Sequence, residues 1–338
     1  MAKILLLGAT GFLGKHLIKK LDGHDVSCLV RPGSDISHLE GKNLIYGDVT
    51  NLEDLIAALK GYGTSEKLPD ARKQGVDAGA VLPIRRQGND AVDTADGSFS
   101  EVPQEIIINL TTPNTQDYET NRRIIVDGGR NIIEAAQRAK VRQIIHLSSA
   151  AIYRKNLDSY GKAKKEADDL FLNSASLGLS ITLLRPTMIY GRGGYVAEKL
   201  FSSATKIPFF VFVIGNGKNK IQPVFVDDVV LAIIASIDFA PAGRAIFDLG
   251  GPYEITYDAF IKKILSAIHK KKIIIHIPAF LIIFLVKLMS LFIKNLAFNS
   301  TTIKRMLEEI HLDTDHTIRE LKIKMTDYDD ALNRLMLK

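Results

Sequence analysis

Cysteine is nearly absent from this sequence, since Cys28 is the only one among 338 residues. A single cysteine excludes an internal disulfide framework and is typical of proteins from a reducing compartment. Because Cys28 lies in the apolar run from Val26 to Val30, we expect a buried structural thiol. The apolar start of the chain is interrupted at Gly8, too early for a signal peptide. These features predict a cytoplasmic protein.

Long uncharged runs and basic blocks are also missing. The uncharged run from Ile273 to Val286 is shorter than the roughly 20 residues that a membrane-spanning helix needs. The formal net charge of +6 favours anionic ligands or a membrane surface only weakly. No basic block is interleaved with aromatic residues, so we expect no nucleic-acid partner. We also expect no metal site.

The start of the chain has the order strand, glycines, helix. Residues 4–7 form a continuous apolar run, typical of a strand buried on both faces, and residues 15–21 have helical periodicity. Glycines at G-x-x-G-x-x-G spacing allow a tight turn close to a pyrophosphate, which the N-terminus of the helix attracts. The pattern predicts dinucleotide binding through Gly8, Thr10, Gly11, Phe12, Leu13 and Gly14.

The end of the second predicted strand, residues 25–30, indicates which dinucleotide is bound. An acid at this position binds the adenosine ribose of NAD, whereas an arginine favours the 2′-phosphate of NADP. The sequence has Arg31 and then Ser34. We therefore expect NADP, with NAD as the alternative, and a stacked Arg31 on the adenine is the competing interpretation. After the third strand, Asp48 and Val49 are expected to border the adenine.

A polar insertion, residues 61–103, follows the third strand (43–46) and an amphipathic helix (52–60). In a right-handed βαβ sheet, a connection from helix to strand lies at the amino ends of the strands. Ligands bind at the carboxyl ends, so we expect a partner-binding or disordered segment rather than a lid.

The next two strands end at the cofactor edge of the sheet. The fourth strand, residues 105–110, leads into a polar loop, and the fifth, residues 141–147, leads into Ser148 and Ser149. At the end of the fourth strand, we expect Leu110, Thr111 and Thr112 to contact the cofactor.

Tyr160 and Lys164 follow, four residues apart and therefore on one face of a helix. A phenol has a pKa near about 10, but a neighbouring ammonium stabilises the phenolate and a serine hydroxyl binds a developing oxyanion. With Ser149 on the same rim, the three groups can move a proton on or off a carbinol while a cofactor carries hydride. The same spacing alone is common on solvated helix faces.

A smaller lobe is predicted after the sixth strand, residues 179–185. In residues 222–230, a short strand is expected to enter a helix that Asp227 or Asp228 caps. For residues 278–298 we expect an apolar helix, buried against the fold or a partner, or lying in a membrane interface. Burial is the favoured interpretation. The domain boundaries are therefore predicted at 1–185 and 186–338.

Together these residues resemble the short-chain dehydrogenase/reductase superfamily, specifically its extended branch of nucleotide-sugar epimerases, dehydratases and ketoreductases. The landmarks are Gly8, Gly11 and Gly14, Gly47-Asp48-Val49, Ser148-Ser149, Tyr160 and Lys164, Leu184 to Gly191, and Pro223 to Asp228. The resemblance, which covers the chain outside residues 61–103, implies a Rossmann-type doubly wound parallel sheet with a smaller C-terminal α/β substrate lobe.

The resemblance also implies a role for each site residue. Tyr160 would be the acid/base, Lys164 its pKa-lowering partner and a ligand of the cofactor ribose, and Ser149 the contact of the substrate hydroxyl. Pro186 and Ile189 would flank the nicotinamide through backbone groups.

The sequence departs from the family pattern at three places. Ile125 stands where the family usually has an asparagine, unless Asn121 substitutes for it. Thr111 and Thr112 replace a pair of smaller residues, and the connection from Tyr153 to Tyr160 is short. These traits are similar to atypical members, among them the nucleotide-binding accessory subunit of respiratory complex I.

From these observations we expect a two-lobe NAD(P)-dependent enzyme that transfers hydride at a carbinol or ketone carbon of a nucleotide sugar. A catalytically silent dinucleotide-binding protein is the first alternative, and a ketoreductase of lipids or isoprenoids is the second. Family members commonly pair through the helix that carries Tyr160, so a homodimer is compatible with the sequence. Peripheral membrane contact through residues 278–298 is compatible as well.

Overall fold

The computed structural model describes residues 1–60, 105–113, 115–194, 209–290, 303–304 and 307–336. Its centre is a parallel seven-stranded sheet in the order β11-β6-β5-β4-β1-β2-β3. The strands are β1 (Lys3–Leu7), β2 (Asp25–Val30), β3 (Asn43–Tyr46), β4 (Ile106–Asn109), β5 (Gln143–Leu147), β6 (Ser180–Pro186) and β11 (Arg244–Leu249).

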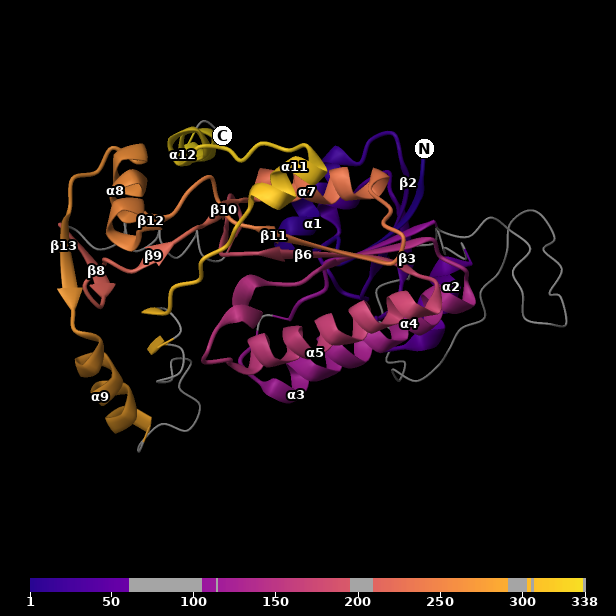
Figure 1. Cartoon of the computed structure of the whole chain (residues 1–338), viewed down its shortest axis with the longest axis horizontal. Coiled ribbons are helices and arrows are strands. Elements are labelled where there is room, and N and C mark those ends of the chain that lie inside the picture. The colour runs from indigo at the N-terminus through magenta and orange to yellow at the C-terminus, as the bar shows by residue number, and fades with distance from the viewer. Residues whose placement is uncertain (61–104, 114, 195–208, 291–302, 305–306, 337–338) are drawn as a thin grey trace, which may run out of the picture.

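Helices cover both faces of this sheet, as Figure 1 shows. One face carries α1 (Phe12–Leu17), α7 (Val226–Asp238) and α11 (Asp315–Leu321), and the other carries α2 (Leu52–Leu59), α4 (Gly128–Arg138) and α5 (Ser159–Ser174). The central strands β1 and β4 are almost entirely apolar, as expected of strands that are buried on both faces. The predicted α/β Rossmann-type fold is confirmed.

The smaller lobe lies at the left in Figure 1 and consists of short sheets and helices. Its elements are β7 (Ile189–Tyr190), β8 (Phe210–Ile214), β9 (Lys220–Ile221), β10 (Val224–Phe225), β12 (Ile255–Thr256), α8 (Tyr257–Ala267), β13 (Ile273–Ile277), α9 (Ala279–Ser290) and α12 (Tyr328–Met336). β8 pairs with β13, β7 with β10, and β9 with β12. The chain crosses between the lobes more than once, since β11 belongs to the large sheet.

Most predicted element boundaries agree with the structure within a few residues. The helical segment before β5 is continuous from residue 118 to residue 138, because α3 (Tyr118–Asn121), a π-helical turn (Arg122–Asp127) and α4 follow one another directly. The polar insertion, residues 61–103, and the end of the predicted apolar helix, residues 291–298, lie outside the described residues.

Two expectations were wrong. The α7 helix follows Phe225, and neither Asp227 nor Asp228 caps it. The apolar helix is not buried against the fold in its described part, since Phe280 and Phe284 in α9 are 73% and 62% exposed. The two other environments expected for this helix, contact with a partner or a position in a membrane interface, remain open.

Candidate active site

The glycine turn after β1 has the shape that a dinucleotide diphosphate requires. Gly8 has a φ of +85°, and the Gly11 N–H donates to the Gly8 carbonyl over 3.1 Å. A Cβ at Gly14 would lie 2.3 Å from the Gly8 oxygen, so only glycine permits this helix–turn contact. The exposed Gly11 precedes α1 without a side chain of its own, which leaves the N–H groups of the first turn open to an anion. The turn thus fits a nicotinamide dinucleotide.

The neighbours of this turn hold it in place. Thr10 is half-buried and Leu13 is buried. The Phe12 ring packs on the loop at residues 191–194, where a Cβ at Gly194 would come within 2.7 Å of it. The Nε2 atom of His38 lies 3.1 Å from the Ala9 carbonyl oxygen. No pattern in the sequence indicated this contact.

Arg31 is exposed directly after β2, and Ser34 closes the following turn by donating its N–H to the Arg31 carbonyl. The nearest acid in the chain, Asp35, is paired with Lys15 at 2.9 Å and accepts hydrogen bonds from Ser37. These contacts, led by the Lys15 bond, hold the pKa of Asp35 below its ordinary value. Its carboxylate is therefore already engaged.

The remaining adenine-side and nicotinamide-side residues are mostly held by local bonds. Asp48 accepts from the Thr50 N–H and hydroxyl, both at 2.9 Å, and Val49 is buried. Thr111 directs its N–H and hydroxyl back to Asn109, and the Thr112 hydroxyl bonds the Thr111 carbonyl. These side chains therefore form part of the edge of the site at the carboxyl ends of the strands.

Three further positions border the predicted nicotinamide site. Leu110 is buried beside Gly8, whose added Cβ would lie 3.0 Å from the Leu110 carbonyl carbon. Pro186 is buried at the end of β6, and Ile189 is half-buried in β7.

Ser149, Tyr160 and Lys164 come together at the carboxyl ends of β5 and its neighbours. Asp158 caps α5 by accepting the Gly161 N–H, which sets Tyr160 in the first turn and Lys164 one turn later. The Tyr160 phenol interacts with the Ser149 side chain. The Lys164 ammonium lies 5.9 Å from the centre of the Tyr160 ring. The constellation expected from the sequence is therefore assembled.

The protonation states follow from burial. Withdrawal from water is the largest influence on Tyr160 and raises its pKa to about 12, although the Ser149 bond acts in the opposite direction. The same effect lowers the pKa of the fully buried Lys164 to about 8, against the attraction of Asp168. At neutral pH the phenol therefore holds its proton, and most of the lysine is an ammonium.

Lys164 is held inside the protein. Its ammonium donates to the Leu147 carbonyl over 2.7 Å, and the side chain has no exposed surface. Ser149 accepts the Ala151 N–H at 3.1 Å, so its own hydroxyl proton stays available for donation. A contact between Lys164 and the cofactor ribose stays a prediction.

No pattern in the sequence indicated a chain of polar groups that runs behind the site, from the buried Asp168 and Arg185 to the exposed Tyr153 and the half-buried Asp248. Asp168, one turn after Lys164, accepts from Arg185 Nε at 2.8 Å. The Arg185 guanidinium donates to the Tyr153 hydroxyl at 2.7 Å, and this hydroxyl donates to Asp248 at 2.9 Å. Three separate elements thus meet behind the catalytic helix, which no local spacing could reveal.

The asparagine missing at position 125 has a partial counterpart in space. Ile125 belongs to the apolar core, within the π-helical turn. Asn121 is fully buried and donates to the Thr115 carbonyl at 3.2 Å and to the Ser159 hydroxyl at 3.3 Å. It therefore links α3 to the residue directly before Tyr160.

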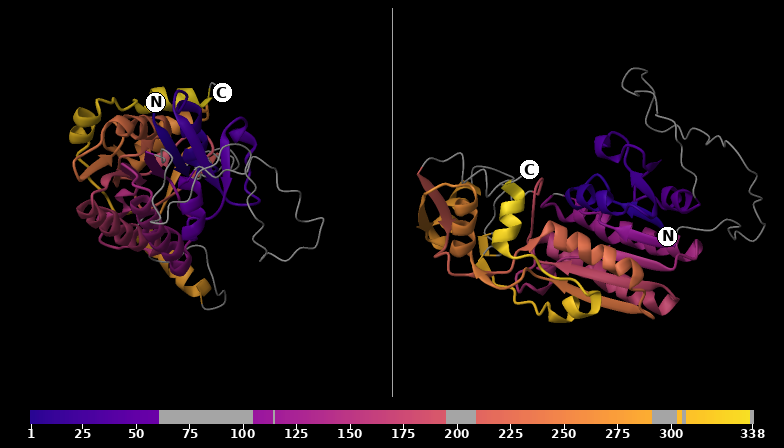
Figure 2. Two further views of the ribbon diagram at one scale, coloured as in Figure 1. Left: turned by 90° about the vertical axis from the view of Figure 1, so that its right-hand side faces the viewer. Right: turned by 90° about the horizontal axis from the view of Figure 1, so that it is seen from above.

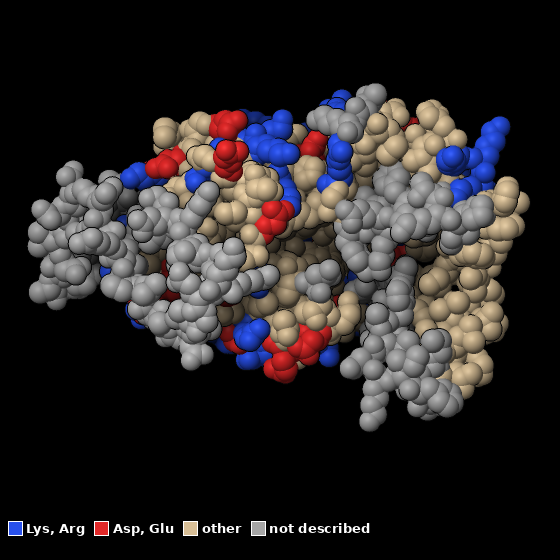
Figure 3. Space-filling model, turned by 180° about the vertical axis from the view of Figure 1, so that it is seen from behind, with Lys and Arg blue, Asp and Glu red and all other residues tan. Residues whose placement is uncertain are grey.

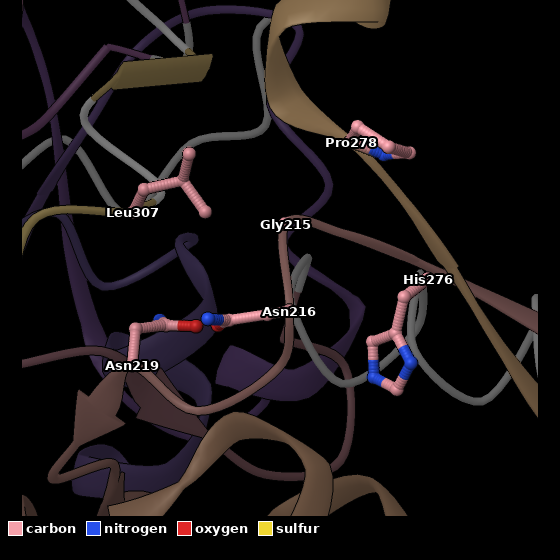
Figure 4. Close-up of a pocket in the computed structure, with 6 residues that line it drawn as sticks. All are labelled: Gly215, Asn216, Asn219, His276, Pro278 and Leu307. Carbon is pink, nitrogen blue, oxygen red and sulfur yellow. The ribbon is translucent and has the colours of Figure 1, made fainter.

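A pocket of about 570 Å³ opens in the smaller lobe. Figure 4 shows its lining of Gly215, Asn216, Asn219, His276, Pro278 and Leu307. The His276 ring lies 2.8 Å from an Asp258 carboxylate oxygen, which orients the imidazole. Among the described residues, no group of three or more His, Cys, Asp or Glu side chains could hold a metal ion. None of the described helices has the length and hydropathy that crossing a bilayer requires.

Comparison with known proteins identifies the family. A nucleotide-binding parallel sheet with a tyrosine–lysine pair at its carboxyl edge defines a short-chain-dehydrogenase-type enzyme. Residues 4–85 and 90–250 match the NAD dependent epimerase/dehydratase family. The chain belongs to this family. The match includes most of residues 61–103, which the sequence analysis had placed outside the resemblance.

Three curated relatives illustrate the range of similarity. The N-acetyl-alpha-D-glucosaminyl-diphospho-ditrans,octacis-undecaprenol 4-epimerase of Escherichia coli O157:H7 is 23% identical, over 81% of this chain and 75% of the relative. The mitochondrial NADH dehydrogenase [ubiquinone] 1 alpha subcomplex subunit 9 of Arabidopsis thaliana is 26% identical over 73% and 53%. The decarboxylating sterol-4-alpha-carboxylate 3-dehydrogenase of Mus musculus is 24% identical over 86% and 75%.

Solved structures support the fold. UDP-glucose 4-epimerase of Thermotoga maritima superposes with a TM-score of 0.70 at 15% identity, covering 99% of this chain and 97% of the epimerase. The family and its enzymatic relatives identify the chain as an enzyme of the extended short-chain dehydrogenase type that uses a nicotinamide dinucleotide.

Proposed function

We propose that the chain transfers hydride to or from a carbinol or ketone carbon, with Tyr160 as the acid/base. The observation that carries this proposal is the meeting of Ser149, Tyr160 and Lys164 at the carboxyl edge of the sheet that holds the glycine turn. When bound, the nicotinamide supplies or accepts the hydride.

The chain's own residues would manage the proton and the orientation of the substrate. The phenol of Tyr160 keeps its proton at neutral pH because burial raises its pKa to about 12, so it is ready to protonate a carbonyl oxygen. Ser149 would donate a second hydrogen bond to the same oxygen. Lys164 would fix the tyrosine helix to β5 through the Leu147 carbonyl and place positive charge behind the ring.

Two further parts of the proposal concern ligands. Arg31 and Ser34 favour NADP over NAD, because the exposed guanidinium is free to meet a phosphate while Asp35 is occupied by Lys15. For the substrate we favour a nucleotide sugar, seated between Tyr160 and the pocket of the smaller lobe.

The second candidate substrate is a lipid or isoprenoid derivative. It is favoured by the exposed apolar side chains of α9, which begins directly after the pocket residue Pro278. The relative from Escherichia coli acts, by its name, on an undecaprenol-linked sugar. We also propose a cytoplasmic protein that contacts a membrane peripherally through residues 278–298.

Two structural proposals complete this picture. The division into residues 1–185 and 186–338 describes two functional lobes, although β11 and α7 return to the large sheet. A homodimer would use α5, whose Lys162 and Lys165 side chains are exposed.

The acid/base role is tested by Tyr160→Phe, which removes the proton and keeps the ring. Turnover should fall by roughly 10²–10⁴-fold, while the affinity for NADPH, measured by its fluorescence, stays nearly unchanged. The matched control is Tyr118→Phe, whose phenol bonds Glu166 at 2.6 Å. Undiminished turnover in Tyr160→Phe, or an equal loss in the control, would contradict the assigned role.

The cofactor preference is tested by Arg31→Ala. Loss of a charged bond to the 2′-phosphate should weaken NADPH binding by roughly tenfold or more relative to NADH. Arg142→Ala, at the exposed amino edge of the sheet, is the control. An unchanged ratio of the two affinities would remove the reason for preferring NADP.

A further inference from the structure

The outer face of the β8–β13 sheet is apolar and uncovered. The two strands pair in parallel, with Phe210 opposite Ile273 and Phe212 opposite Ile275. Alternate side chains point inward, where Val211 and Ile274 pack against α8. The outward side chains Phe212 and Ile273 are 50% and 63% exposed. A sheet with one face toward water normally carries polar residues there, and this one carries phenylalanine and isoleucine.

The α9 helix continues this face. It begins two residues after β13 and contains 12 residues, of which the described side chains are all apolar. Its most exposed members are Phe280 and Phe284, and Leu281, Leu285 and Leu288 are each more than 40% exposed. At 3.6 residues per turn these five residues lie within an arc of about 140°, so they form one apolar side of the helix that faces water. We call the outward side chains of β8, β13 and α9 the apolar wall.

The wall lies at the far end of the smaller lobe, away from the large sheet. Figures 1 and 2 show β8, β13 and α9 along this end, with α8 on their inner side. Contiguous exposed apolar surface of this kind marks a protein or membrane contact.

The charge around the wall identifies its partner. From Asp258 to Glu308 the sequence has eight lysines and one arginine between the two acids, and no other aspartate or glutamate. Lys270 and Lys271 are exposed directly before β13. Figure 3 shows Lys and Arg side chains gathered at the upper corner of this end of the molecule, above the uncharged wall. An apolar surface bordered by lysines complements an anionic lipid headgroup layer.

We propose that the apolar wall and Lys270–Lys271 form a docking surface for anionic lipid bilayers, extending the membrane contact proposed above. The phenylalanines enter the boundary between headgroups and acyl chains, and the lysines bind the headgroups. A second copy of the chain fits less well, because pairing two walls would bring two basic, acid-free segments together. The helix, about 18 Å long, lies in the interface and does not cross the bilayer.

Docking would bring the pocket of the smaller lobe to the membrane. Pro278 lines the pocket and connects β13 to α9, and His276 lines it from β13. A substrate with a lipid tail could therefore enter the pocket without leaving the interface. This consequence rests on the proposed function, whereas the binding experiments below do not.

The absence of tryptophan provides a direct probe of depth. In Phe284→Trp the single indole should shift its emission to shorter wavelength, and be quenched by brominated lipids, when vesicles with about one-quarter phosphatidylglycerol in phosphatidylcholine are added. The matched control is Leu177→Trp, which replaces another exposed side chain, 60% accessible, at the end of α5. Its emission should not change.

The contribution of the lysines to membrane binding is tested by co-sedimentation of the full chain with the same vesicles. Lys270→Glu/Lys271→Glu should lower the partition coefficient by roughly tenfold or more, and about 1 M salt should have a similar effect on the wild type. Lys140→Glu/Arg142→Glu, exposed at the amino edge of the large sheet, is the control and should bind as the wild type does. Phe280→Gln/Phe284→Gln should also lose binding, with an unchanged thermal transition.

Three outcomes would overturn the docking proposal. They are no sedimentation with anionic vesicles, equal binding to pure phosphatidylcholine by all variants, or a stable dimer in solution that Phe280→Gln/Phe284→Gln converts to a monomer. Turnover of a water-soluble substrate is measured in parallel on the same wall variants. Because the wall lies outside the proposed catalytic residues, its loss would leave that turnover intact, so failure of one proposal is separable from failure of the other.

Discussion

Lys164 combines two properties that rarely occur in one side chain, complete burial and a position beside a proposed acid/base. Its neighbours are the Leu147 carbonyl, the Tyr160 ring and Asp168 on the next turn of α5. Burial outweighs the attraction of Asp168 and lowers its pKa from 10.5 to about 8. The protein therefore holds this proton less firmly than the unfolded chain does.

The lowered pKa of Lys164 makes stability depend on pH. Between about pH 8 and pH 10.5, Lys164 is protonated in the unfolded state and has lost its proton in the folded state. The contribution of Lys164 to the free energy of unfolding therefore increases as pH rises. This contribution is complete above 10.5 and is lost as pH falls through 8. Compared with Lys164→Met, the wild type should gain roughly 3 kcal/mol over this interval, measured by urea unfolding at several pH values. A difference that is constant with pH would contradict the shift.

The three residues that we propose to act on the substrate could be singled out in the sequence because their spacing is local. Tyr160 and Lys164 meet on one helix, and Ser149 follows the strand that supports it. Asp168, Arg185 and Asp248 are joined only in three dimensions, across α5, β6 and β11. The sequence also did not indicate in which direction the pKa of Tyr160 shifts. The adjacent lysine led us to expect a lowered pKa, whereas burial raises it.

Among the elements, the glycine turn contains one glycine that packing requires and another that faces the expected ligand. A Cβ at Gly14 would lie 2.3 Å from one carbonyl oxygen and 2.5 Å from a second, that of Ala9. At Gly11 the closest atom to an added Cβ would be the Gly8 oxygen at 3.3 Å. Gly14 therefore serves the contact between turn and helix, whereas Gly11 faces outward at the start of α1.

Two alanine substitutions should distinguish these roles. Gly14→Ala should lower the free energy of unfolding by roughly 1–3 kcal/mol because the turn must move. Gly11→Ala should leave stability within about 1 kcal/mol but weaken NADPH binding, since its methyl group would enter the space of the diphosphate. Denaturant unfolding without cofactor and NADPH titration measure the two effects. If Gly11→Ala were the more destabilising variant, the assignment would be reversed.

Element positions were largely predictable, and their exceptions have physical reasons. Buried parallel strands give continuous apolar runs, so β1, β2 and β4 were evident. The strand β11 is partly exposed and itself contains Arg244 and Asp248, which hides its pattern. The acids after β10 suggested a helix cap, but Asp228 is 1% exposed and faces the C-terminal segment instead.

For the whole molecule, that C-terminal segment joins the two lobes. The α11 helix packs on β11 and α7, and α12 packs on α8 in the smaller lobe (Figure 2). Between them, Thr326 donates its N–H and hydroxyl to Asp228, at 2.9 and 2.6 Å. The fully buried Tyr328 donates its hydroxyl to the Tyr253 carbonyl at 2.7 Å. The charged tail of the sequence thus supplies part of the core.

The adjacent acids of α7 provide a matched test of this connection. Asp228→Ala should lower the free energy of unfolding by roughly 1–3 kcal/mol, because it leaves the Thr326 N–H unsatisfied. Asp227→Ala, whose carboxylate lies 3.7 Å from His16 and is 44% exposed, should change it by about 0.5 kcal/mol or less. Thermal and urea unfolding measure both. Equal effects would mean that the segment is not held through Asp228.

The parallel sheet, the glycine turn and the grouping of Ser149, Tyr160 and Lys164 follow from the amino-acid sequence alone, because each depends on short-range periodicity or on glycine geometry. The protonation of these groups, the polar chain from Asp168 to Asp248 and the exposure of α9 depend on the packing of the folded chain. Burial and the meeting of distant segments are properties of the packed chain, and no local pattern contains them.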